Sequence, residues 1–107
     1  MLKPSTLKLD QHGYLIDLND WNEEIAIYFA NADALQLTAE HWEIIYFLRD
    51  FYQQYQLSPA IRILVNELKK KYGAEKGNST YLYKLFPKGP AKQATKIAGL
   101  PKPVRCI

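Results

Sequence analysis

The sequence predicts a mainly α protein: a small helical bundle with an N-terminal β-hairpin and a flexible C-terminal arm. Over most of the chain apolar residues recur at helical spacing. Near the N-terminus they alternate with polar residues around a glycine, as in a short hairpin. The last eight residues contain two prolines and cannot continue a helix. At 107 residues, of which 48% are hydrophobic, the chain is expected to form one domain over residues 1–107.

The expected hairpin covers residues 8–18. Short runs of alternating apolar and polar side chains precede and follow Gly13, which has the backbone freedom that a tight turn requires. Because an isolated hairpin is only marginally stable in water, we expect it to pack against the helices.

The first two helices are predicted at residues 21–34 and 38–55. Asn19 or Asp20 can cap the first helix, whose first turn holds two glutamates that suit the helix dipole. Thr38 can cap the second, the longest in the chain. The apolar stripe of this second helix is so wide that we expect it to be the central, most buried one.

Three further helices are predicted at residues 59–72, 79–86 and 90–98, and Asn78 can cap the second of them. Ser58, followed by a proline, is expected to cap the first of them, and a lysine run near its end suits the negative end of the helix dipole. Gly99 is expected to end the last one, and the extended arm follows.

Charge is divided unevenly between the two halves of the chain. Residues 1–60 carry three basic and nine acidic side chains, whereas residues 61–107 carry eleven basic and two acidic ones. The division indicates a basic surface that meets an acidic protein or nucleic acid, or two halves that attract each other within the fold. No segment predicts a membrane span or a secretory signal, so we expect a cytoplasmic protein that does not bind membranes.

Cys106 is the single cysteine and the second-to-last residue. It cannot form an intramolecular disulfide, and its terminal position favours an exposed, reactive thiol. The sequence lacks the spacings of a zinc site or a phosphate-binding loop, and its two histidines stand alone. We therefore expect Cys106 to be the catalytic residue, with no metal or organic cofactor. Its thiol is mostly protonated at neutral pH and needs a partner's active site to activate it.

The chain resembles the DsrC/TusE family from about Gly13 to Ile107. The likeness rests on the penultimate cysteine and on the stretches LTAEHWEIIYFLRDFY, PAIRILV and STYLYKLFPKGPAKQATKIAGLPKP. The resemblance implies a helix-turn-helix-like core, a swinging arm over residues 99–107 and a persulfide carried on Cys106. Family members associated with dissimilatory sulfite reductase have a second cysteine where this chain has Thr95, so the chain is more similar to the single-cysteine TusE branch.

For that branch the resemblance implies a sulfurtransferase in a sulfur relay. The implied donor is a TusBCD-like complex, and the implied acceptor is an MnmA-like tRNA thiouridylase, alone or with bound tRNA, that 2-thiolates the wobble uridine. Basic residues are expected to guide docking to these partners or to contact the arm: Arg62, Lys88, Lys92, Lys96, Lys102 and Arg105. Two alternatives are a helix-turn-helix nucleic-acid-binding module and a DsrC-like carrier that serves sulfite reductase.

Overall fold

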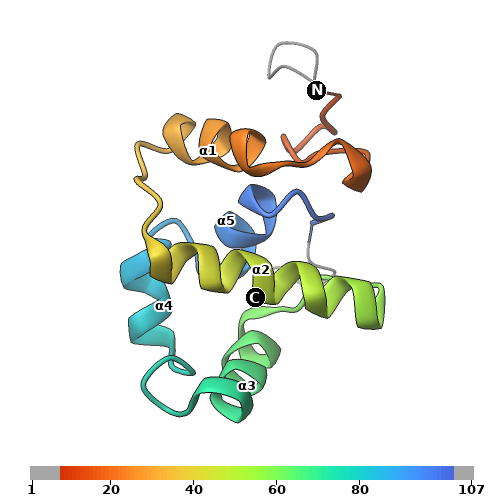
Figure 1. The fold of residues 1–107 in the computed structure, drawn as a ribbon. Coiled ribbons are helices and arrows are strands. Elements are labelled where there is room, and N and C mark those ends of the chain that lie inside the picture. Colours follow the sequence, from red (N-terminus) through yellow and green to blue (C-terminus); the bar gives the residue numbers. More distant parts are fainter. Residues whose placement is uncertain (1–7, 103–107) are drawn as a thin grey trace.

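Helices make up nearly all of the regular structure in residues 8–102, the part of the chain that the computed structural model describes. In chain order they are the short 3-10 helix η2 (Leu18–Asp20), α1 (Glu23–Ala32), α2 (Ala39–Tyr55), α3 (Ile61–Tyr72), α4 (Ser79–Leu85) and α5 (Pro90–Ile97). Figure 1 shows α5 in the middle, with α1 on one side of it and α3 and α4 on the other. None of these helices has the length and hydropathy that a membrane span needs.

The central helix is α5, which contacts each of the four other α-helices. Six of its eight residues are buried, among them Ala91 and Ala94. Small side chains let neighbouring helices approach closely, so this short helix fits inside the bundle. The expectation that the 38–55 helix would be central was wrong, because α2 keeps one exposed edge on which Tyr46 and Asp50 lie.

All five α-helices contribute to one hydrophobic core. In α3, Leu64 and Leu68 lie one turn apart and are fully buried. The other large members of the core are Ile25, Phe29, Ile44, Ile45, Phe47, Leu48, Leu82, Phe86, Ile97 and Leu100.

The predicted N-terminal β-hairpin is not formed. Leu9 and Leu15 make one isolated antiparallel bridge, and residues 8–102 contain no strand. The Asp10 carboxylate instead accepts hydrogen bonds from the backbone amides of His12 and Tyr14, at 2.8 and 3.0 Å. These bonds close a turn stabilised by a side chain. The chain then enters η2, so the alternating stretch is too short to extend the pairing.

Two helices begin after the caps that the sequence predicts. Thr38 precedes α2, and its backbone amide donates to Nδ1 of His41 at 3.0 Å, which completes a capping box with histidine at the third position. Asn78 precedes α4, and its side chain accepts from the amide of Tyr81 at 2.7 Å.

Two other helices begin later than predicted. Asn22, rather than Asn19 or Asp20, caps α1, because residues 18–20 form η2 instead. The third helix, α3, begins at Ile61, two residues beyond the predicted start, because the Ser58 hydroxyl is bonded to a distant part of the chain.

Candidate functional site at the root of the C-terminal segment

Cys106 and Arg105 lie outside the described residues. The described part of the chain that leads to them is the short segment after α5, residues 98–101, which we call the root. The root sets the position and direction from which the cysteine-bearing segment starts.

The root begins with a Schellman motif at the end of α5. The Leu100 amide donates to the Thr95 carbonyl and the Gly99 amide to the Lys96 carbonyl, both at 3.1 Å. Gly99 has a φ of +72°, and a Cβ on it would lie 2.3 Å from Cδ1 of Trp21, so only glycine fits. The Leu100 side chain is 2% exposed and belongs to the core. The direction in which the chain leaves α5 is therefore fixed.

Trp21 and Arg49 hold the end of α5 through its last carbonyl groups. Trp21 Nε1 donates to the Ile97 carbonyl at 2.8 Å, and Arg49 Nη1 donates to the Ala98 carbonyl at 2.6 Å. A helix leaves such carbonyls without partners, and a cation there suits the dipole. The guanidinium also lies 4.1 Å from the centroid of the Trp21 ring, a cation–π contact. Burial lowers the pKa of Arg49 from its usual value, but a guanidinium stays protonated in proteins.

The third attachment of the root comes from the connection between α2 and α3. The hydroxyl of buried Ser58 donates to the Pro101 carbonyl at 2.6 Å. Gly99, Leu100 and Pro101, the first residues of the expected arm, are thus bonded to or packed against the body. An extended chain spans about 17 Å from Pro101 to Cys106, against about 23 Å counted from Gly99.

A groove of about 410 Å³ opens beside the root. Its lining includes two side chains of opposite charge, Arg49 and Asp50. The full lining is Leu18, Asn19, Tyr46, Arg49, Asp50, Tyr52, Gln53, Gln56 and Leu100.

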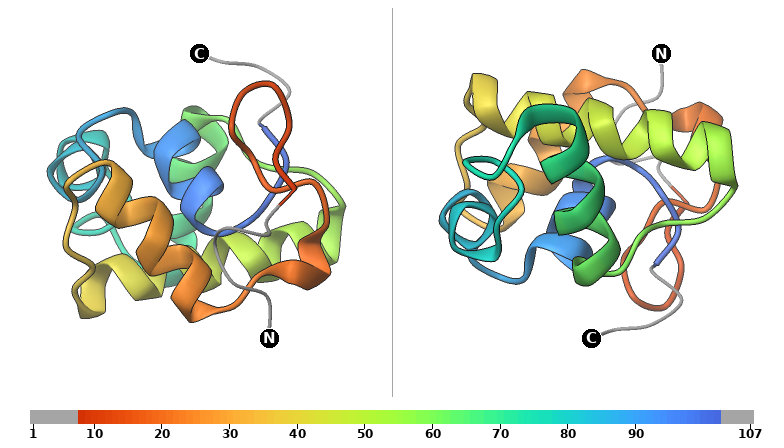
Figure 2. Two further views of the ribbon diagram at one scale, coloured as in Figure 1. Left: turned by 90° about the horizontal axis from the view of Figure 1, so that it is seen from above. Right: turned by 90° about the horizontal axis from the view of Figure 1, so that it is seen from below.

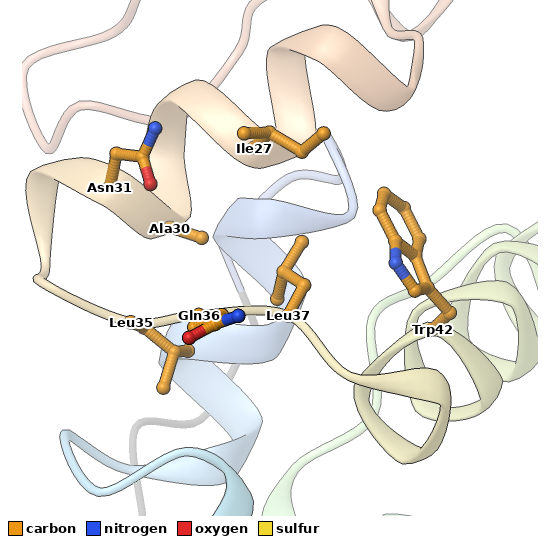
Figure 3. Close-up of a pocket in the computed structure, with 7 residues that line it drawn as sticks. All are labelled: Ile27, Ala30, Asn31, Leu35, Gln36, Leu37 and Trp42. Atoms are coloured by element: carbon orange, nitrogen blue, oxygen red, sulfur yellow. The ribbon is translucent and has the colours of Figure 1, made fainter.

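A second hollow, of about 180 Å³, lies at the other end of α2 (Figure 3). It is lined by Ile27, Ala30, Asn31, Leu35, Gln36, Leu37 and Trp42. None of these side chains ionises at physiological pH, so this hollow offers no acid, base or thiolate.

The lysines expected to guide docking have different surroundings. Lys88 forms an ion pair with Asp33, with 3.2 Å between Nζ and Oδ1. Lys92 is exposed on α5, whereas Lys96 is half-buried and its side chain lies close to Gly13. Lys102 is half-buried as well. Of these four lysines, Lys92 alone is both exposed and without an ion pair in the described residues.

Arg62 is exposed in the first turn of α3, where a cation opposes the helix dipole. Within residues 8–102 its side chain makes no hydrogen bond or ion pair. Neither an ion pair nor a contact to the root therefore compensates its charge in this part of the chain.

Thr95 is fully buried in α5, and its hydroxyl has no hydrogen-bond partner in the described structure. A hydroxyl cannot form a disulfide with Cys106, so this position supplies no second thiol. Residues 8–102 also contain no group of three or more His, Cys, Asp or Glu side chains that could hold a metal ion.

Sequence reasoning missed Trp21, Arg49 and Ser58 as residues of the site. Arg49 carried a signal, since it is a lone cation among the apolar residues of the 38–55 stretch. For Trp21 and Ser58 the sequence predicts only that each lies at the start of a helix. Nothing local to them indicated that their bonding partners lie 76 and 43 residues further along the chain.

The family model described as "DsrC like protein" matches residues 1–107. The sulfurtransferase TusE of Pectobacterium atrosepticum is 60% identical over 102 residues, covering 95% of this chain and 94% of the relative. The sulfurtransferase TusE of Escherichia coli is 56% identical over 101 residues, covering 94% of this chain and 93% of the relative.

Among solved structures, Allochromatium vinosum DsrC matches with a TM-score of 0.85 and 55% identity, covering 94% of this chain and 90% of that one. The oxidised DsrC subunit of dissimilatory sulfite reductase from Archaeoglobus fulgidus matches with a TM-score of 0.79 and 45% identity, covering 94% and 92%.

These features define a small carrier protein: a helical body, a root that Arg49 and Ser58 bond to that body, and a penultimate cysteine. The chain belongs to the DsrC family. It is a sulfur-relay protein, a sulfurtransferase, as the family resemblance of the sequence implied.

Proposed function

We propose that Cys106 receives sulfane sulfur from a TusBCD-like donor and passes it to an MnmA-like tRNA thiouridylase for 2-thiolation of the wobble uridine. The names of the curated relatives support this assignment over the other branch of the family. The residue at position 95 supports it too, because a carrier that forms an internal disulfide or trisulfide needs a second thiol, and Thr95 has none.

The transfer consists of two displacements at sulfur. The Cys106 thiolate attacks the outer sulfur of the donor's cysteine persulfide; the donor S–S bond breaks, and the donor cysteine leaves as a thiolate. Cys106 now carries the persulfide. A thiolate of the acceptor then attacks the outer sulfur, the new S–S bond breaks, and Cys106 leaves as a thiolate. One sulfur atom moves at each step, and no external oxidant or reductant is consumed.

The observation that carries the proposal is the contrast between the root and the cysteine. Trp21, Arg49 and Ser58 fix the chain up to Pro101, and the thiol follows five residues later. We propose that the arm begins after Pro101 and brings Cys106 to an active site on each partner in turn. In docking, the exposed lysine of α5, Lys92, would face an acidic partner surface, assisted by Lys88, Lys96, Lys102 and Arg105.

Sulfur loading of the C-terminal peptide tests the proposal. After incubation with a persulfidated donor, mass spectrometry without reductant should show a gain of about 32 Da on the peptide that contains Cys106. Cys106→Ser should remove this gain and leave the melting temperature unchanged, because serine has no sulfur to load. Loading that persists in Cys106→Ser, or a wild-type protein that is never loaded, would refute the proposal.

A further inference from the structure

Helices α3 and α4 lie on the side of the protein away from α1 (Figure 1; Figure 2, right). Their exposed side chains form what we call the cationic surface. The exposed residues of α3 are Arg62, Ile63, Asn66, Lys69, Lys70 and Lys71. Those of α4 are Ser79, Thr80, Tyr83 and Lys84. Neither set contains an acidic side chain, but the half-buried Glu67 of α3 pairs with Lys70, with 3.7 Å between Oε1 and Nζ. The exposed residues of α1 and α2 show the reverse, since they include acidic side chains and no cation: Glu23, Glu24, Glu40 and Asp50.

The electrostatics of α3 itself explain only part of this surface. Lysines in the last turn of α3 suit the negative end of its dipole, but Arg62 in the first turn opposes the positive end. Arg62, Asn66 and Lys70 follow at four-residue spacing and share one helix face, along about 12 Å of the axis. Arg62 has no acidic partner within residues 8–102, so its charge is available to an anionic ligand along this face.

The turn between α3 and α4 holds the two helices in a fixed relation. A Cβ on Gly77 would lie 2.3 Å from Cα of Lys69, so the turn packs directly on the α3 backbone. The Asn78 amide donates to the carbonyls of Ala74 and Glu75 at 2.8 and 2.7 Å. The Glu75 carboxylate is the exposed acidic group of this turn. The backbone positions from which the cationic side chains of the two helices extend are thus fixed.

We propose that this cationic α3–α4 surface binds the sugar-phosphate backbone of RNA, specifically of the tRNA on which the acceptor enzyme works. The inference rests on the proposed function and assigns that function a direct RNA contact. Centres of protein–protein interfaces are depleted of charged residues, whereas α3 carries Arg62 in its first turn and three lysines in its last turn. Hydroxyl and amide donors from Asn66, Ser79 and Thr80 suit phosphate and sugar oxygens. Tyr83, at 50% exposure, can stack on an unpaired base.

Fluorescence anisotropy with a transcribed, unmodified tRNA that carries a wobble uridine tests the inference. The surface variant is Arg62→Gln, Lys69→Gln and Lys70→Gln; the matched control, Lys88→Gln, Lys92→Gln and Lys96→Gln, loses the same net charge from the region of α5. The surface variant should bind tRNA at least about tenfold more weakly than wild type, with a salt slope lower by about 2 to 3. The control should stay within about threefold of wild type. The charge-retaining variant Arg62→Lys, Lys69→Arg and Lys70→Arg should bind like wild type.

Three outcomes would overturn the inference: no tRNA binding by wild type, equal losses in the surface variant and the control, or weaker binding of the surface variant to the thiouridylase without tRNA. The last result would assign the surface to a protein partner. Persulfide loading of Cys106, measured in the same preparations, separates this inference from the proposed function. Normal loading without tRNA binding would leave the relay standing and remove only the RNA contact.

Discussion

Arg49 and Trp21 hold adjacent carbonyl groups at the end of α5 while stacking on each other. The guanidinium lies 4.1 Å from the indole centroid and donates to the Ala98 carbonyl, and the indole donates to the Ile97 carbonyl. Tyr46 meets the same indole edge-to-face, with 5.9 Å between ring centroids. This cluster joins the start of α1 and the middle of α2 to the point where the chain departs for Cys106. The cluster therefore fixes the direction in which the chain leaves α5.

Removing the guanidinium of Arg49 should destabilise the protein. Arg49→Met keeps an apolar stem but leaves the Ala98 carbonyl without a partner and removes the cation–π contact, so the free energy of unfolding should fall by about 2–3 kcal/mol. Arg49→Lys retains a charge and a donor and should lose about half as much. Urea denaturation measures both. A loss under about 0.5 kcal/mol for Arg49→Met would mean that water replaces the guanidinium at no cost.

Gly99 should tolerate substitution less well than Gly73, although both have positive φ. Alanine at Gly99 places its Cβ 2.3 Å from Cδ1 of Trp21, whereas nothing lies within 4 Å of a Cβ at Gly73, where φ is +92°. Gly73→Ala therefore reports backbone strain alone. Gly99→Ala should lose about 1–3 kcal/mol more in thermal or urea unfolding, because it adds overpacking against the indole. Equal losses would show that Trp21 moves aside freely.

Truncation should locate the boundary between body and arm. A chain ending at Pro101 retains Leu100 in the core and should unfold within about 0.5 kcal/mol of the full chain. A chain ending at Gly99 loses a side chain that is 2% exposed, together with the bond from Ser58 to Pro101, and should lose about 3 kcal/mol. Both truncated proteins lack Cys106, so neither should accept sulfur. If the two were equally stable, the root would contribute nothing to the fold.

The parts of the fold that could be predicted from the sequence are those that depend on local chemistry. Thr38 and Asn78 mark helix starts through bonds that span three residues. The Thr38 amide donates to Nδ1 of His41, and the Tyr81 amide donates to the Asn78 side chain. The prediction of a hairpin was wrong because strand pairing depends on more than the local sequence pattern. Alternation around Gly13 indicates a strand only if a partner strand is long enough, and the local bonds of Asp10 close a turn first.

The candidate site also contains residues that could be predicted from the sequence and residues that could not. Cys106 stands out because of its position in the sequence, and no contact had to be known to single it out. Arg49, Trp21 and Ser58 act only through carbonyl groups that the fold brings to them from residues 97–101. The central position of α5 could not be predicted either, because alanines such as Ala91 and Ala94 give a weak apolar signal in the sequence even though they are buried.

Neutralising the lysines of α5 should slow docking and leave the chemistry of Cys106 intact. Lys88 is already paired with Asp33, so Lys88→Gln alone should change little, and Lys92→Gln with Lys96→Gln should account for most of the effect. Transfer of radiolabelled sulfur from the protein donor should be several-fold slower in this double variant at low salt. The difference from wild type should shrink as ionic strength rises, because charges are screened beyond about 10 Å at about 0.1 M salt.

Reaction of Cys106 with a small-molecule persulfide provides the control, and its rate should be the same in the double variant and in wild type. A double variant that accepts sulfur from the protein donor as fast as wild type at low salt would show that these lysines are ordinary solvated surface, and that another part of the body recognises the donor.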